Sequence, residues 1–210
     1  MGEKVDQPSK SAAGEVSASR PLRADAKRSE EALLEAALEV FATSGVDAPV
    51  RQIADKAGVG IGTLYRRFPQ RADLVVAVFR QQVDACANAA PVLAAEHAPS
   101  EALARWMQRY ADFIATKRGL ASALQSGDPA FKGLPAYFET KLTPALRTLL
   151  DSAAAAGQVR ADVEPYDLLR AAANLCMSAK DDQTDYARRM VALLVDGLRY
   201  GANAPATPPP

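Results

Sequence analysis

Residues 25–71 contain the feature that most restricts the fold, because three short apolar stretches with helical spacing follow one another between glycine and proline breaks. The first begins at Asp25 and runs to Ser44–Gly45, with Leu33, Leu34, Ala37, Leu38 and Phe41 on one side. The second begins at Pro49 and ends at Gly58–Val59–Gly60, and the third ends before Pro69. Apolar residues three and four apart predict amphipathic helices. A tight glycine turn between two short helices is typical of a helix-turn-helix.

The rest of the chain has the same helical periodicity over longer stretches, so we predict an all-α fold. We expect helices over residues 72–90, 100–117, 135–156, 165–179 and 184–200, with short helical pieces around 120–126. No stretch has the alternation of apolar and polar residues that a half-buried strand requires. A chain of 210 residues with 49% apolar side chains is large enough to bury the core of such a bundle.

This pattern divides the chain into four parts. Residues 1–22 are rich in Ser, Ala, Gly and Lys without periodicity and are predicted to form a disordered arm. Residues 23–71 form the predicted helix-turn-helix domain, and residues 72–203 form a larger helical domain. Residues 204–210 are predicted to be a disordered, proline-rich tail. The helix after Pro69 would belong to both folded domains.

The charge is balanced over the whole chain but basic in one place. The 25 basic and 25 acidic residues cancel, which by itself argues against a nucleic-acid partner. Residues 51–71, however, contain five basic residues and Asp55 as the single acid. The distribution of charge matters more than its total for binding DNA. This segment is therefore the candidate DNA-binding surface.

The third short helix has one face for the core and another for a negatively charged partner. Leu64 and Phe68 are four residues apart and share the inner face. Thr63, Arg66 and Arg67 lie on the opposite side. A helix with two arginines and no carboxylate on its outer face fits the major groove of DNA, where an arginine can bind guanine through two hydrogen bonds.

Neighbouring residues extend this predicted DNA contact. Gly60 and Gly62 lack side chains and would allow the backbone to approach phosphates, which the free N–H groups of a helix start attract. Ile61 would pack either on a thymine methyl group or in the small core. Tyr65 and Arg71 are placed to reach phosphates.

From about Asp25 to Val83 the sequence resembles the TetR (tetracycline-repressor) family of transcriptional regulators. The resemblance rests on the leucine-rich first helix ending in Phe41 and Gly45, the Ile53–Ala54 pair, the Ala57–Gly58–Val59 turn, the Gly62–Thr63–Leu64–Tyr65 run, and Phe68, Arg71 and Leu74. The sequence departs from the family at Gly60 and Ile61, where Ser and a polar or basic residue are frequent. It also departs at Ala48 and Pro49, where Thr is frequent.

The resemblance implies specific DNA contacts. Thr63, Tyr65, Arg66 and Arg67 match the contacts of the family's recognition helix. Arg51 matches a second-helix position that reaches a base, and Arg71 matches a phosphate-binding position. Together with the first turn of the third helix, the predicted DNA-binding residues are Arg51, Gly60, Ile61, Gly62, Thr63, Tyr65, Arg66, Arg67 and Arg71.

The resemblance also implies that residues 72–203 bind a small molecule, whose identity the sequence leaves open. A stripe of large apolar side chains at helical spacing is either core or the wall of a pocket between helices. Asn174 lies in an otherwise apolar helix, where a buried amide needs a hydrogen-bond partner. The candidate pocket residues are Phe79, Val83, Trp106, Met107, Tyr110, Phe113, Tyr137 and Asn174.

The last two helices are expected to form a homodimer, as the resemblance implies. A helix-turn-helix dimer contacts two half-sites about 34–36 Å apart, so two copies must be held at that spacing on a palindromic operator in double-stranded DNA. Small residues among large ones allow close approach of the helices. The candidate dimer residues are Leu168, Leu169, Ala172, Leu175, Met190, Leu194 and Leu198.

The sequence thus predicts a repressor that a small-molecule ligand releases from its operator. Two alternatives stay open, namely a regulator controlled by a protein partner without such a ligand, and an activator. An enzyme is not expected, because the glycines at 58–62 follow a helix and lack the spacing of a dinucleotide loop. His97 has no cysteine or carboxylate cluster at metal spacing. We therefore expect no catalytic residue, metal or cofactor.

A cytoplasmic protein without membrane contact is expected. The first twenty residues lack the apolar segment of a secretory signal, and no apolar run approaches the ~20 residues that cross a bilayer. The two cysteines, Cys86 and Cys176, lie far apart in apolar helical patterns and are predicted to be buried thiols.

Overall fold

The computed structural model describes residues 19–118, 120–124, 126–177 and 184–200, and throughout these ranges the fold is all-α, as predicted. The elements in chain order are α1 (Ser19–Ser44), α2 (Val50–Lys56), α3 (Ile61–Arg67), α4 (Arg71–Glu96), α5 (Pro99–Arg118), α6 (Ala121–Leu124), the 3₁₀ turn η1 (Pro129–Phe131), α7 (Leu134–Ala155), α8 (Pro165–Met177) and α9 (Thr184–Arg199). Within these ranges no helix has an apolar stretch long enough to cross a membrane.

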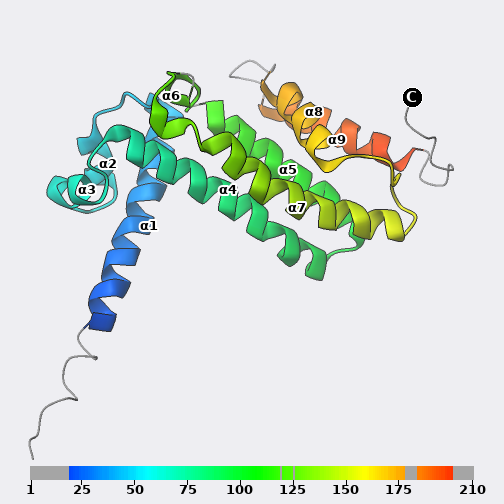
Figure 1. The fold of residues 1–210 in the computed structure, drawn as a ribbon, viewed down its shortest axis with the longest axis horizontal. Helices are drawn as coiled ribbons and strands as arrows, with labels where there is room; N and C mark the ends of the chain where they lie inside the picture. Colours follow the sequence, from blue (N-terminus) through cyan, green and yellow to red (C-terminus); the bar gives the residue numbers. More distant parts are fainter. Residues whose placement is uncertain (1–18, 119, 125, 178–183, 201–210) are drawn as a thin grey trace, which may run out of the picture.

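Two groups of helices are distinguished in Figure 1. The N-terminal domain consists of α1, α2 and α3, with the two short helices at one end of α1. The helical body consists of α4 to α9, in which α4, α5 and α7 pack side by side and α8 and α9 pack on α5. Since α4 packs on α1 as well as on α5 and α7, it belongs to both parts, as the sequence indicates.

Several boundaries differ from the sequence-based prediction. Helix α1 begins at Ser19, so it extends into residues 19–22 of the predicted arm, whereas residues 1–18 and the predicted tail 204–210 lie outside the described residues. Helix α4 continues past the predicted end at residue 90, through Pro91. A proline removes one helical hydrogen bond. Here the alanine-rich neighbours favour helix, and Leu93 beyond the proline packs on the core.

The core of the N-terminal domain comes from the inner faces that the periodicity predicts. Leu33, Ala37 and Phe41 of α1 are buried against Ile53 of α2 and Leu64 of α3, each with at most 1% of its surface exposed. The two short helices α2 and α3 can bury so little area separately that they depend on this shared contact with α1 for stability. The orientation of α3 is therefore determined by packing on its inner side, which leaves its outer side available for contacts.

The turn between α2 and α3 depends on one glycine. Gly58 has φ +68°, the left-handed region that residues with a Cβ rarely adopt. It follows Ala57 at the end of α2, where the Val59 N–H donates to the Ala54 carbonyl at 3.0 Å. This arrangement ends a helix and reverses the chain within few residues. The sharp angle between α2 and α3 follows from it.

Both cysteines are buried thiols that form no disulfide, as predicted. Burial raises the pKa of the Cys86 thiol to about 12, so this group stays protonated and unreactive at neutral pH.

Alanine substitutions at two glycines of the helix-turn-helix should have opposite effects on stability. Gly58→Ala forces a Cβ into left-handed backbone, and we expect it to lower the free energy of unfolding by about 1–2 kcal/mol. Gly62→Ala lies within α3 without a positive φ, and its Cβ would meet no atom within 4 Å. It should raise the free energy of unfolding by up to about 1 kcal/mol. Urea unfolding followed by circular dichroism measures both, and equal effects would contradict the assigned backbone geometry.

Candidate nucleic-acid interface

The outer face of α3 is exposed to solvent. Tyr65 is 50% exposed and Ile61 39%, and Arg66 and Gly62 are exposed beside them. Leu64, one residue from both Thr63 and Tyr65, is turned inward and 1% exposed. The predicted inward position of Leu64 and outward position of Arg66 are thus confirmed, whereas Thr63, predicted on the outer face, is half-buried. Exposed tyrosine and isoleucine on a small domain suggest a contact surface rather than ordinary solvated residues.

The glycines at the start of α3 have no role in internal packing. Gly60 occupies the N-cap position, and its carbonyl accepts the N–H of Thr63 at 2.9 Å. A Cβ built on Gly60 or Gly62 would meet no atom within 4 Å. The fold itself leaves space for a larger residue at both positions, so internal packing does not require glycine there.

The basic residues of the segment differ strongly in their surroundings. Arg67 is turned toward α1, where its Nη2 donates to both carboxylate oxygens of Glu30 at 2.5 and 2.6 Å. Lys56 of α2 likewise pairs with Glu39 of α1 at 2.6 Å. Arg66 is exposed, and within the described ranges no ion pair involves it. Carboxylates of α1 therefore neutralise two of the five basic residues of this segment, Lys56 and Arg67, which the sequence alone did not indicate.

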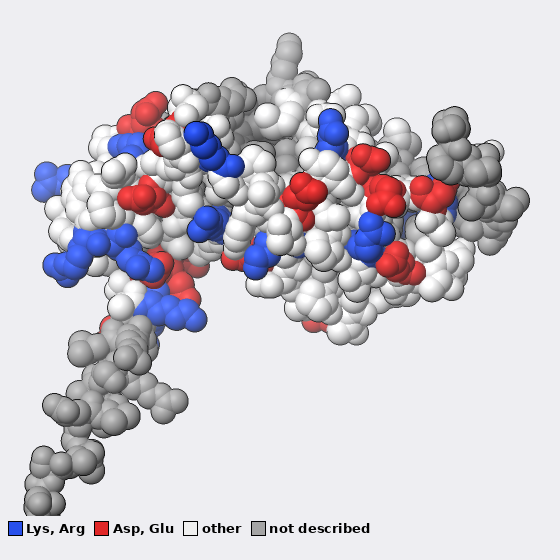
Figure 2. Space-filling model, viewed as in Figure 1, with Lys and Arg blue, Asp and Glu red and all other residues white. Residues whose placement is uncertain are grey.

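Figure 2 shows the distribution of basic and acidic side chains on one face of the molecule. Lysine and arginine side chains gather at the end of the molecule where α2 and α3 lie, with acidic side chains at the border of this region. Arg51 of α2 is exposed there and, like Arg66, forms no ion pair with the described residues. Arg51 and Arg66 are therefore the arginines of the helix-turn-helix most open to an anionic partner.

Arg71 has an internal role that sequence reasoning did not foresee. It is half-buried at the start of α4, and its Nη1 donates to the carbonyls of Val46 and Ala48, the latter at 2.8 Å. These carbonyls belong to the loop between α1 and α2, which cannot satisfy them by helical hydrogen bonds. The predicted phosphate contact of Arg71 would have to come from the rest of its guanidinium.

Most candidate pocket residues form a closed aromatic core. Trp106 and Tyr110 stack in parallel with ring centres 5.8 Å apart, and Phe79 meets Phe113 edge-on at 5.9 Å. Trp106, Met107, Tyr110 and Val83 are fully buried. The stripe is thus packed core in this conformation.

The polar atoms of this core bind the protein itself. Trp106 Nε1 donates to the Cys86 carbonyl at 2.9 Å, and the Tyr110 hydroxyl donates to the Leu169 carbonyl at 3.1 Å. Burial raises the pKa of Tyr110, so its hydroxyl stays protonated and can donate. A ligand entering this core would have to separate the aromatic rings.

The two polar candidates lie at the margin of the core. The half-buried Tyr137 donates its hydroxyl to the Asp84 carboxylate at 2.8 Å, which links α7 to α4. The pKa of Tyr137 is raised, mainly by burial and to a smaller extent by this hydrogen bond to Asp84. Asn174 is exposed in the single subunit, so the burial that the sequence suggested for this amide is not found within one chain. Helix α8 buries Ala172 and Cys176, and residue 174 between them points to the other side.

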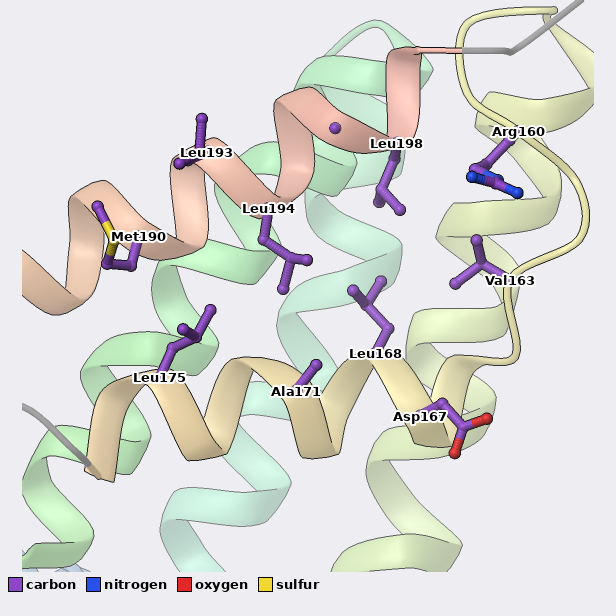
Figure 3. A pocket seen from close by; sticks show the side chains of 11 residues that line it. Arg160, Val163, Asp167, Leu168, Ala171, Leu175, Met190, Leu193, Leu194 and Leu198 are labelled. Atoms are coloured by element: carbon purple, nitrogen blue, oxygen red, sulfur yellow. The ribbon is translucent and has the colours of Figure 1, made fainter.

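The predicted dimer residues divide into two groups. Leu168, Leu169, Ala172 and Leu198 are buried within the subunit, whereas Leu175, Met190 and Leu194 are half-buried. These three, with Leu168 and Leu198, line a groove of about 600 Å³ between α8 and α9. Figure 3 shows Leu168, Leu175 and Leu194 pointing into the space between the two helices.

Helix α9 has an outer apolar stripe that sequence reasoning used only in part. Its inner stripe is Ala187, Val191, Val195 and Leu198, all buried. Its outer stripe is Met190, Leu193, Leu194 and Gly197, which all line the groove. Leu193 is 64% exposed and belongs to the apolar pattern of this helix at a spacing of three from residue 190, but it was not among the candidate dimer residues. A helix that is apolar on two sides needs a second partner.

Comparisons with known proteins agree over both parts of the chain. Residues 33–78 match the family model described as bacterial regulatory proteins, tetR family. Residues 98–200 match the C-terminal domain of SbtR-like transcriptional regulators. A TetR transcriptional regulator from Streptomyces coelicolor is 39% identical, with 81% of this chain and 98% of that chain covered and a TM-score of 0.71.

Two further relatives are similar. A TetR transcription regulatory protein from Mycobacterium vanbaalenii is 38% identical, covering 85% of this chain and 99% of that one, with a TM-score of 0.66. A helix-turn-helix-type transcriptional regulator from Staphylococcus aureus is 36% identical over 64 residues, or 30% of this chain. That match spans only 35% of the curated relative. These relatives are regulators rather than enzymes, in agreement with the sequence-based expectation.

Removing Arg71 should affect stability much more than removing Arg66. Arg71→Ala leaves the carbonyls of Val46 and Ala48 without their donor, and we expect a loss of about 1–3 kcal/mol in the free energy of unfolding. Arg66→Ala changes an exposed residue and should stay within about 0.5 kcal/mol of the unsubstituted protein. Chemical unfolding of both variants checks this, and an Arg71→Ala protein of unchanged stability would contradict the structural role.

Proposed function

The chain belongs to the TetR family of transcriptional regulators, and from this premise we propose that it is a repressor whose dimer holds a palindromic operator with its two α3 helices until a small molecule releases it. The main support is the outer face of α3, where Arg66 is exposed and unpaired among described residues and the glycines have no packing role. A surface of this kind suits the major groove.

The proposed contacts differ in what they supply. Arg66 binds a guanine edge, and Arg51 of α2 reaches a neighbouring base. Tyr65 binds a phosphate through its hydroxyl, and Thr63 binds a base or a phosphate. At Gly60, Ile61 and Gly62 the backbone comes close to the DNA, and the Ile61 side chain, 39% exposed, packs on a thymine methyl group.

We further propose that α8 and α9 form the dimer interface. The exposed apolar surface of α9 continues into the groove that it forms with α8, and surfaces of this kind mark protein contacts. A second copy would cover Leu193 and Met190, which one subunit alone leaves in water. The same pairing supplies the fixed spacing that two recognition helices require.

Release by a small molecule requires a ligand that binds one conformation better than another. In this proposal the ligand separates the aromatic rings around Trp106 and displaces α4, which carries Phe79 and Val83 of that core and also packs on α1. The shift would change the distance between the two α3 helices of the dimer.

A second candidate function is regulation without a ligand in this core. The observation that favours it is the closed packing, in which the polar atoms of Trp106 and Tyr110 already have protein partners. Trp106 is the single tryptophan of the chain, so its fluorescence reports directly on ring separation. A compound that lowers operator affinity and changes this emission supports the first candidate. A compound that lowers affinity without changing the emission rules out this core as the ligand site.

Arg66→Ala should weaken operator binding strongly. Loss of a two-bond guanine contact costs about 1–3 kcal/mol, or about five- to 150-fold in affinity per half-site, and should relax the preference at one base pair. Selection of bound fragments from genomic DNA first defines the operator, and fluorescence anisotropy then compares the variants. Arg105→Ala on α5, which removes an exposed arginine outside the helix-turn-helix, is the matched control. If Arg66→Ala keeps the original affinity and preference, as the control does, Arg66 does not contact the bases.

Leu193→Glu should prevent dimerisation without unfolding the subunit. The side chain is 64% exposed in one subunit, so the charge disturbs the monomer little but is costly between two apolar faces. Sedimentation velocity should show a monomer, and operator affinity should fall. Val92→Glu on α4, where the side chain is 53% exposed outside the groove, should leave the dimer intact. A dimeric Leu193→Glu protein would contradict the proposed interface.

A further inference from the structure

Glu30 has a different environment from the other acidic residues in the middle of α1. Its carboxylate accepts two hydrogen bonds from Arg67 of α3, a residue 37 positions further along the chain, and it is 30% exposed. Glu31 instead pairs with Lys27 on its own helix at 3.7 Å and is 52% exposed. Glu35 is exposed. The contact between Glu30 and Arg67 therefore joins α1 to the end of the recognition helix.

The two adjacent arginines of α3 are not equivalent as a result. Successive residues of an α-helix point about 100° apart, so Arg66 and Arg67 leave the helix in different directions. Arg66 is exposed and forms no ion pair with the described residues, whereas the charge of Arg67, whose side chain is 57% exposed, is balanced by Glu30 of α1. A carboxylate binds a guanidinium through the same paired geometry as a phosphate does, and it competes with phosphate for this site.

We propose that Glu30 is a specificity-determining residue, which withholds Arg67 from the DNA phosphates and leaves base contact to Arg66. This inference rests on the proposed function of α3. A neutral pair releases no counterions from DNA, so it adds nothing to the binding that all duplexes share. A free arginine at residue 67 would strengthen binding to every duplex alike and would reduce the preference for the operator.

The test is a salt titration of binding to the operator and to a random duplex of equal length. Glu30→Gln keeps the shape of the side chain and removes its charge. The plot of log affinity against log salt should become steeper by about 0.9 per subunit, since each newly contacted phosphate adds about that slope. Affinity for the random duplex should rise several-fold at moderate salt, so the ratio of operator to random affinity falls.

Variants of Arg67 separate this contact from a general charge effect. Glu30→Gln with Arg67→Ala removes both charges of the neutral pair and should return to the original slope. Arg67→Ala alone leaves the Glu30 carboxylate uncompensated, so it should weaken binding to both duplexes without losing the slope of a phosphate contact. Glu35→Gln removes one exposed negative charge from the same helix and should change the slope less than Glu30→Gln does. Thermal unfolding of each variant checks that the fold is retained.

Three results would overturn the proposal. The first is a Glu30→Gln protein with the original slope, and the second is a Glu35→Gln protein with the same increase as Glu30→Gln. The third is an Arg67→Ala protein that loses operator affinity together with about 0.9 of slope, which would mean that Arg67 already contacts a phosphate. Failure of the proposed function gives a different result, because the unsubstituted protein would then bind no duplex in preference to random DNA. The salt slopes on random DNA would still show whether Glu30 keeps Arg67 from the phosphates.

Discussion

The apolar core along α4 is the contact on which the rest of the structure depends. This helix buries Leu74 and Val75 near its start and Cys86 and Ala90 further along, so one continuous core extends from the N-terminal domain into the body. Neither part can change its position relative to α4 without exposing apolar surface or repacking it. Movement between a few packed arrangements is therefore favoured over gradual bending, which is the behaviour that a two-state regulator needs.

A second constraint is the distribution of charge around α3. Helix α1 supplies the inner wall of the small domain and also the carboxylates of Glu30 and Glu39, which balance Arg67 and Lys56. The same helix thus determines both the position of α3 and the number of cations that remain open to DNA. A chain with no net charge is compatible with a DNA-binding surface because its acidic residues pair with other cations and, among the described residues, leave Arg51 and Arg66 without an ion pair.

The local features could be predicted from the sequence, and contacts between distant residues could not. Helical spacing, Gly58 and Pro69 were enough to predict the helix-turn-helix and the inward position of Leu64, because these signals act over a few residues. The partners of Arg67 and Arg71 lie 37 and 25 residues away, so spacing gives no sign of them. The exposed Asn174 shows the same limit, since neighbours in the sequence do not reveal which side of α8 is covered.

The empty space around Gly60 and Gly62 has a consequence for how this protein can evolve. A Cβ at either position would meet no atom within 4 Å, and Ile61 and Tyr65 beside them are exposed. Substitutions there alter the surface offered to the double helix while the buried contacts of Leu64 and Phe68 stay intact. A gene duplicate could therefore acquire a new target sequence through a handful of changes without first passing through unstable intermediates.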